Sequence, residues 1–375
     1  MNTKVETSSA PPESLWHLAM KRLFADRVAM ASFAVVALFI VMLFLSLVGL
    51  IASDWEKEVG VNYAPPHFVG VQQPGSHVSG RQAKNVPENP RDPLREVIRE
   101  LRTDIQANRP SKVAVPDYGI KDPLQADLDA IRGQLQPKTG EGAVVREQTL
   151  LFGADKWGHD VLKKVIKGSE TSIVVGLVAA LVATVIGTVL GALSGYFEGW
   201  LDDCLNWFYS VFTSIPYLLL ILAVAAVLQS KGIMTIILIL GLTGWTGVFR
   251  LVRAEYMKHR DREYVMAAGA IGASHWRRIF VHIFPNISHI PLVQFSLMAV
   301  GFIKSEVILS FLGFGVPVGE VSWGSMLNEA QNELILGKWW QLAAVTVVMA
   351  VLITALSLFT DGLRDALDPK LKQGQ

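Results

Sequence analysis

The chain has 375 residues, of which 51% are hydrophobic, and its mean hydropathy of +0.36 is too high for a soluble protein. The formal net charge of +1 gives no electrostatic basis for binding nucleic acid. The single cysteine, Cys204, excludes a disulfide framework and a cysteine-based metal cluster within the chain.

Six apolar stretches are long enough to cross a bilayer, which takes about 20 helical residues. They lie at residues 28–52, 171–195, 205–229, 233–252, 287–311 and 342–360. Backbone groups in lipid must be hydrogen-bonded within the chain, so we expect helices, and the sequence predicts an all-α polytopic membrane protein. The first stretch, of about 25 residues, is too long for the apolar core of a signal peptide and is expected to be retained.

Basic residues predict the orientation. They gather before the first span, between the fourth and fifth, and after the sixth, and they are Lys21, Arg22, Arg27, Arg250, Arg253, Lys258, Arg260, Arg262, Arg277, Arg278, Arg364, Lys370 and Lys372. With six spans these three segments share one side, which the positive-inside rule makes cytoplasmic. We therefore expect both termini in the cytoplasm.

The expected organisation follows from these spans. It is a cytoplasmic N-terminal segment (1–27), a first transmembrane helix (28–52), an external region (53–168), a five-helix core (169–361) that contains the loop 255–286, and a cytoplasmic tail (362–375). In the external region, apolar residues fall at helical spacing within 94–105 and 124–135. Two short amphipathic helices are one interpretation, and a partly disordered linker is the other, because so few apolar residues can hardly form a core.

Glycines mark two of the expected helices. Gly187, Gly191 and Gly195 recur every four residues and so line one face, which allows close contact with another helix. A second set, with a spacing of three on the fourth helix, is Gly241, Gly244 and Gly247. Packing is the favoured interpretation of both sets over a substrate-lining role.

Three further residues are unusual inside membrane spans. Lys304 and Glu306 lie two positions apart on the fifth helix and therefore point in different directions. Intramembrane charge marks a pathway or a partner, so Glu306 is a candidate for a cavity or gate, with a purely structural hydrogen bond as the alternative. Pro216 lies inside the third stretch, predicts a bend there, and is the second cavity or gate candidate.

The segment 263–286, between the fourth and fifth spans, is long enough for two short helices. It carries a run of tiny side chains, namely Ala267, Ala268, Gly269, Ala270, Gly272, Ala273 and Ser274. Small side chains on a short helix let a partner surface approach the backbone, although an ordinary cytoplasmic loop is the alternative. The histidines 275, 282 and 289 have a sevenfold spacing, but Pro285 interrupts the helix between them and we expect no metal site.

No nucleotide-binding GxxxxGK[ST] motif occurs in the sequence, so energised transport would draw its energy from another chain.

Four blocks of sequence carry a resemblance to a known family. They are Leu151–Ser172 (LFGADKWGHDVLKKVIKGSETS), the loop at 263–286, Ser310–Leu327 (SFLGFGVPVGEVSWGSML) and Thr360–Leu371 (TDGLRDALDPKL). In this order they resemble the permease subunits of bacterial ATP-binding-cassette importers. Within that family the chain is similar to the second permease of dipeptide, oligopeptide, nickel and microcin C-type systems.

The resemblance implies a six-helix permease of the type I importer fold with a periplasmic insertion between helices 1 and 2. It implies a non-catalytic subunit in the bacterial inner membrane that translocates peptides or peptide-like compounds. The implied partners are a second permease in a heterodimer, two cytoplasmic ATPase subunits that bind ATP and Mg²⁺, and a periplasmic substrate-binding protein. No cofactor is expected in this chain.

The family's EAA loop, which docks on the ATPase, matches the segment 263–286. The residues expected to couple this chain to the ATPase are Glu263, Ala267, Ala268, Gly272, Ala273, Ser274 and Pro285.

The sequence departs from the family pattern at several places. Met266 stands where the family has glutamate, and Glu263, nearly one turn earlier, is a possible substitute. Where the family has an arginine and, three residues later, an acid in the third helix, this chain has Trp207 and Ser210. Residues 72–146 are additional, and we expect them to meet the binding protein or cover the outer mouth.

Two other classes remain open on the sequence alone. A secondary transporter would move substrate without an ATPase. A membrane anchor with an external recognition subdomain would tolerate changes in the loop. The sequence does not decide between dipeptides, oligopeptides, peptide antibiotics and nickel as substrates.

Overall fold

The computed structural model describes residues 15–70, 97, 99, 146–317 and 319–367. The chain divides into two compact units, one formed by Met1–Val71 with Glu147–Gln375 and the other by Gln72–Arg146. Apart from residues 97 and 99, the amphipathic helices predicted within 94–105 and 124–135 lie outside the described residues.

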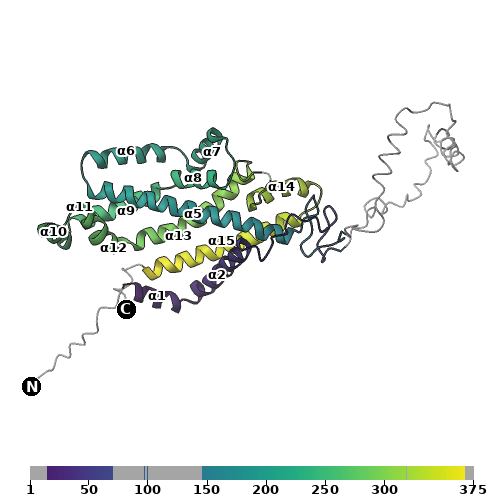
Figure 1. The fold of residues 1–375 in the computed structure, drawn as a ribbon, viewed down its shortest axis with the longest axis horizontal. Coiled ribbons are helices and arrows are strands. Elements are labelled where there is room, and N and C mark those ends of the chain that lie inside the picture. Colours follow the sequence, from purple (N-terminus) through teal and green to yellow (C-terminus); the bar gives the residue numbers. More distant parts are fainter. Residues whose placement is uncertain (1–14, 71–96, 98, 100–145, 318, 368–375) are drawn as a thin grey trace, which may run out of the picture. The chain divides into compact units, whose positions relative to one another are not determined.

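Helices form the regular secondary structure of the described part of the first unit (Figure 1), with turns and irregular segments at 48–70 and 147–160. Its elements are α1 (Leu15–Ala25), α2 (Arg27–Leu47), α5 (Val161–Tyr196), α6 (Trp200–Ser214), α7 (Tyr217–Leu228), α8 (Ile233–Thr243), α9 (Thr246–Arg260), α10 (Glu263–Ala270), α11 (His275–Arg277), the π-helix η1 (Arg278–Ile283), α12 (Phe284–Ile287), α13 (His289–Phe311), α14 (Trp323–Ile335) and α15 (Trp340–Leu367). Among the described residues, strand pairing is limited to isolated bridges.

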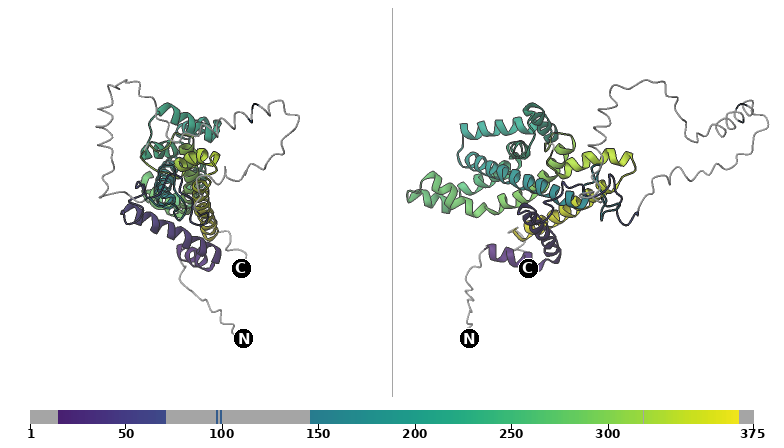
Figure 2. Two further views of the ribbon diagram at one scale, coloured as in Figure 1. Left: turned by 90° about the vertical axis from the view of Figure 1, so that its right-hand side faces the viewer. Right: turned by 45° about the vertical axis from the view of Figure 1, so that its right-hand side comes forward.

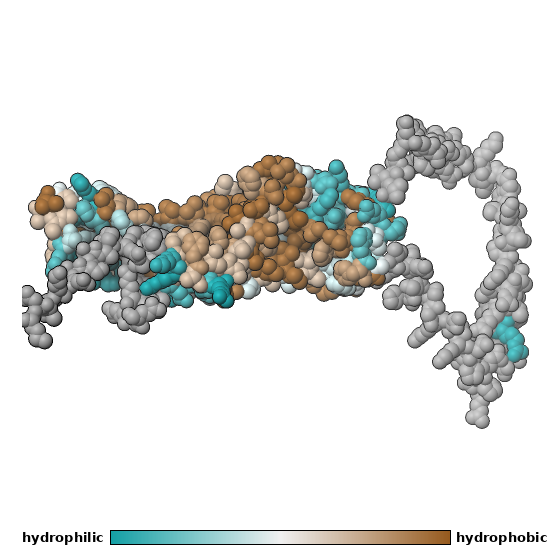
Figure 3. All heavy atoms as spheres, turned by 90° about the horizontal axis from the view of Figure 1, so that it is seen from below, coloured by the Kyte–Doolittle hydropathy of each residue, from teal (hydrophilic) through white to brown (hydrophobic). Residues whose placement is uncertain are grey.

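Five described helical segments are long and apolar enough to cross a membrane, which confirms the prediction of an all-α polytopic protein. They are α2, α5, the pair α8–α9 over Ile233–Arg260, α13 and α15. The pair α6–α7 counts as a sixth only if a span bent by 90° is accepted. Hydrophobic residues cover the middle of the face seen in Figure 3, as expected of a surface in contact with lipid.

The third predicted span, 205–229, is divided in the structure into two helices, α6 and α7, that meet at 90°. The bend attributed to Pro216 is present, but the proline starts a new helix as the N-cap of α7 rather than lying inside one. Proline has no N–H to continue the hydrogen-bond ladder, and it forces the preceding residue into extended backbone. Ile215 has that conformation, with φ −98° and ψ 130°.

The helix α5 lies at the centre of the unit, and its glycine face packs on α9. A Cβ added at Gly187 would lie 2.6 Å from the carbonyl oxygen of Trp245, and one at Gly191 would lie 2.7 Å from that of Phe249. Gly195 meets the carbonyl of Arg253 in the same way. The two backbones are therefore in direct contact, and the predicted packing role of this face is confirmed.

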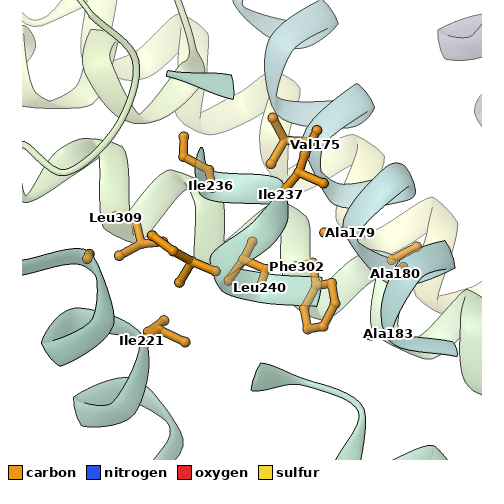
Figure 4. Packing of buried hydrophobic residues seen from close by; sticks show 13 residues of the cluster. Val175, Ala179, Ala180, Ala183, Ile221, Ile236, Ile237, Leu240, Phe302 and Leu309 are labelled. Carbon is orange, nitrogen blue, oxygen red and sulfur yellow. The ribbon is translucent and has the colours of Figure 1, made fainter. Parts of the chain in front are cut away.

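Two apolar clusters hold the other helices on α5. In the first, Figure 4 shows Ile236, Ile237 and Leu240 of α8 among side chains of α5 and α13. In the second, α2 and α15 pack together against α5 around Trp323 and Trp340. Figures 1 and 2 place α2 and α15 on the side of the bundle away from α6.

Buried charges join α5 to α14 at the end of the bundle away from α10. The Lys164 ammonium is 4% exposed and lies 2.8 Å from Asp155 and 2.6 Å from Glu329. Glu333 is 2% exposed, and neither of its carboxyl oxygens has a hydrogen-bond partner among the described residues. Burial raises the pKa of Glu333 to about 7, with Asp155 and Glu329 adding to the effect and Lys164 opposing it.

The glycine face predicts a large difference between two matched substitutions. Gly191→Ala should destabilise the protein by about 1–3 kcal/mol, because the added methyl overlaps the α9 backbone. Gly301→Ala, also within a helix, places its methyl where nothing lies within 4 Å and should be neutral or stabilising. Thermal unfolding of the purified protein in detergent measures both, and equal midpoints for the two variants would contradict the packing assignment.

Glu333 predicts a pH dependence of stability. The pKa of Glu333 in the folded protein lies above the ordinary value of 4.5. Its contribution to the free energy of unfolding is therefore fully present below pH 4.5 and is lost as the pH rises through about 7. The wild type should therefore lose free energy of unfolding between pH 5 and pH 8, whereas Glu333→Gln should not lose this part. The difference between the two proteins should be about 1–3 kcal/mol, since one pKa unit corresponds to about 1.4 kcal/mol. Unfolding midpoints of both proteins at the two pH values test this, and parallel pH profiles would refute it.

Candidate functional site

The segment 263–286 forms two helical pieces joined by a tight turn at the end of the bundle that carries α10 (Figure 1). The first piece, α10, is rich in alanine, which favours helix, and begins with Glu263, whose negative charge suits a helix N-terminus. It ends at a left-handed residue, Gly272, with φ +90°. The Gly272 N–H bonds to the Gly269 carbonyl at 3.0 Å and the Ala273 N–H to that of Ala268 at 2.9 Å. This is a Schellman cap, so Gly272 is needed for the backbone itself.

The α10 helix has a buried side and an exposed side. Val265 and Ala268 are 2% and 4% exposed and face the chain's own core. Met266 is 56% exposed, Ala267 is also exposed, and Ile271 is 87% exposed. Of the small residues predicted to meet a partner, Ala268 therefore faces inward in this structure, while Ala267 and Gly272 remain accessible. We call Met266, Ala267 and Ile271 the α10 outer face.

The second helical piece runs from α11 through η1 to α12. Ser274 caps it, accepting a hydrogen bond from the Arg277 N–H at 3.4 Å. Pro285, near the start of α12, cannot donate to the helix ladder, and the π-helix η1 directly precedes it. The side chain of Asn286 donates to the His282 carbonyl at 2.7 Å and so gives this backbone group of η1 a partner.

An apolar cluster fixes both pieces to the membrane helices. Val265 of α10 belongs to the same buried group as Ile279 and Ile283 of η1, with Tyr256 of α9 and Tyr196 of α5. The Tyr256 hydroxyl also donates to the Ile279 carbonyl at 3.2 Å. Because the inner face of α10 is part of this core, the helix is held by packing on α9 and η1, in a cluster that also contains Tyr196 at the end of α5.

An ion pair near this end of the bundle was not anticipated from the sequence. Arg253 of α9 makes two hydrogen bonds of 2.7 Å to Asp202 of α6, and the Asn206 side chain bonds to the same carboxylate at 2.8 Å. This pair anchors the first turn of α6, a helix with no buried residue. Trp207 and Ser210, where the family has a charged pair, both lie on the exposed surface of α6.

The two cavity or gate candidates lie apart from the segment 263–286. Glu306 is fully buried, and the Ser310 hydroxyl donates to its Oε1 at 2.6 Å. Lys304 is exposed, which confirms that the two charges point in different directions. Pro216 lies at the exposed junction of α6 and α7. The structure does not bring Glu306 or Pro216 together with the coupling residues.

Comparison with known proteins adds to this geometry. Residues 187–373 match the family described as binding-protein-dependent transport system inner membrane component. Residues 14–66 match the N-terminal transmembrane domain of oligopeptide transport permease C. The dipeptide transport system permease protein DppC of Bacillus subtilis (strain 168) is 36% identical over 222 residues, which cover 59% of this chain and 69% of that protein.

The chain belongs to this family of transport permeases. The oligopeptide transport system permease protein OppC of Bacillus subtilis (strain 168) is 34% identical over 59% of this chain and 72% of its own length. The di/tripeptide permease DppC of Pseudomonas aeruginosa (strain UCBPP-PA14) is 34% identical over 63% and 76%. The resemblance read from the sequence is thus confirmed, and the chain is an importer permease subunit.

The first family match contains the whole of α10 to α15, and with it the α10 outer face and the Schellman cap. One solved structure, of inward-facing conformations of the MetNI methionine ABC transporter, aligns with 15% identity and a TM-score of 0.45 over 55% of this chain and 96% of that chain. An alignment at this level carries no argument about mechanism.

The α10 outer face predicts a defect in assembly without a defect in folding. Ile271→Asp places a charge on a side chain that is 87% exposed, so the free energy of unfolding should change by less than about 0.5 kcal/mol. If the expected ATPase covers this face, the substitution buries an unpaired carboxylate in the interface. The amount of ATPase that co-purifies should then fall at least tenfold. The matched control is Ile335→Asp on α14, 84% exposed, which should co-purify like wild type. Equal behaviour of the two variants would contradict a docking role.

Proposed function

We propose that this permease is the non-catalytic membrane subunit of an ATP-driven importer of peptides or peptide-like compounds. It would work beside a second permease as a heterodimer, above two cytoplasmic ATPases that bind ATP and Mg²⁺. A periplasmic binding protein would deliver the substrate. The observation that carries the proposal is the rigid mounting of α10, whose inner face is part of the core while its outer face is exposed.

This mounting suits the transmission of force. A docking helix can drive a membrane domain between two states only if it moves with that domain and makes different contacts in each state. Val265 and the residues around it attach α10 to α9 and η1, so displacement of α10 would displace those elements. A loop without such packing would absorb the motion instead.

The proposed orientation places the α10 end in the cytoplasm and the α14 end in the periplasm. The support is the concentration of Lys and Arg between α9 and α13. It requires the α6–α7 pair to complete one passage through the membrane despite its 90° bend. Both termini are then cytoplasmic, and the membrane is the bacterial inner membrane.

The proposed substrate class rests on relatives. The similar proteins are named as permeases for dipeptides, oligopeptides and di- or tripeptides. We propose the same class here, with selection made largely by the binding protein. We also propose that residues 72–146 meet that binding protein. Deleting them should abolish stimulation by the binding protein but leave ATPase assembly intact, whereas unchanged uptake would count against this role.

The decisive test of the function is reconstitution into liposomes. Uptake of labelled peptide should need this chain, the second permease, both ATPases, the binding protein and ATP together. Omission of ATP should reduce uptake to the level of empty liposomes. Uptake by this chain alone would instead identify a secondary transporter.

Gly272→Asp should abolish uptake in the same system. A Cβ at this position meets nothing within 4 Å in the chain, so the loss would come from the cap conformation or from the docking surface. Gly272→Asn, which also tolerates positive φ, is the companion variant. Unfolding midpoints separate the two causes: loss through the cap conformation lowers the midpoint together with uptake, whereas loss through the docking surface leaves the midpoint at the wild-type value. Full activity of both variants would show that this turn is not a docking element.

A further inference from the structure

A polar joint connects the segment 263–286 to the end of α5, in addition to the apolar cluster. Its centre is Arg278, the first residue of η1, with a half-buried side chain. The guanidinium donates from Nη2 to the Nδ1 atom of His275 at 2.9 Å. It also lies over the ring of Tyr196, with Cζ 5.6 Å from the ring centroid. Tyr196 is the last residue of α5.

The same guanidinium contacts α10. A Cβ added at Gly269 would lie 3.0 Å from Nη1 of Arg278, so the absence of a side chain at Gly269 leaves the space that the guanidinium occupies. Gly269 is in the last turn of α10 and Tyr196 in the last turn of α5. The arginine therefore places its positive charge beside the C-terminal ends of two helices, where the helix dipoles favour a cation.

The aromatic side chains complete the joint. The Tyr196 hydroxyl lies 3.0 Å from the same Nδ1 atom of His275, and the rings of Tyr196, Phe197 and His275 are packed with centroids 5.0–5.7 Å apart. Since an arginine can only donate, Nδ1 of His275 is the acceptor of the bond from Arg278. Arg278, Tyr196 and His275 thus hold one another in a single arrangement.

We infer that Arg278 is a positioning residue that ties α10 to α5, so that the motion of α10 is passed directly to the central helix of the permease. This inference rests on the proposed function, because it presumes that a partner moves α10. The apolar cluster connects α10 mainly to α9 and η1, whereas the Arg278 joint links it to the C-terminal end of α5. The cation–π contact with Tyr196 and the directed donation to His275 resist rotation of α10 better than apolar contact alone.

The test compares four forms of the reconstituted full transporter: wild type, Arg278→Ala, Tyr196→Ala and the double variant. The ATPases should co-purify with all four, because none of the changes touches the α10 outer face. Peptide imported per ATP hydrolysed should fall at least tenfold in each single variant. The double variant should be no worse than the singles, because both remove the same joint.

The matched control is Arg277→Ala, which removes the same charge from the adjacent, exposed position. Its import per ATP should stay within twofold of wild type. Gly269→Val should also lower import per ATP, since its side chain displaces the guanidinium of Arg278 from α10 without removing it. If an alanine variant fails to assemble, Gly269→Val still tests whether the joint is needed.

The outcomes distinguish failure of the proposed function from failure of the inference about Arg278. If wild type itself shows no ATP-dependent import, the proposed function fails. If wild type imports and Arg278→Ala or Gly269→Val keeps the wild-type import per ATP, or if the effects of Arg278→Ala and Tyr196→Ala simply multiply, this inference alone is overturned.

Discussion

The close contact of α5 with α9 is the constraint on which the rest of the structure depends. Gly187, Gly191 and Gly195 let the two backbones touch over about two turns, up to the end of α5. Because no side chains separate them, α9 leaves the membrane region directly beside Tyr196 of α5. The position of α10, three residues after α9, follows from that placement. In lipid, where apolar surface gives little drive for helix association, such backbone contact is a main source of specificity.

The two ends of the bundle are stabilised in different ways. At the α14 end, buried charges join α5 to α14, with Lys164 between Asp155 and Glu329. Burial alone would raise the pKa of Asp155, but Lys164 and His159 bring it below its usual value. Removing the lysine would leave an uncompensated buried carboxylate, a costly change. At the α10 end, apolar packing and the Arg278 joint dominate. The α14 end is therefore expected to respond to pH, and the α10 end to mechanical load.

Hydropathy predicted the apolar helices from the sequence, because a segment that crosses lipid needs about 20 mostly apolar side chains in succession, whatever it packs against. It did not predict where the helices end, since α5 begins at Val161 within the expected external region and α15 continues to Leu367. It also did not show that Pro216 starts a separate helix. In the site, the run of small residues located the segment, and Gly272 has the turn role that glycine often serves. The inward orientation of Ala268 and the partners of Arg278 depend on helices distant in the sequence, and no local pattern reports them.

The central claim is that the α10 outer face binds an ATPase subunit. Site-specific crosslinking tests it most directly. A photoreactive residue at Ile271 would be compared in intact membranes with one at Leu336, an exposed side chain at the α14 end. The account predicts that Ile271 crosslinks to the ATPase subunit and that Leu336 does not. An ATPase crosslink from Leu336 but not from Ile271, or none from either position, would contradict it.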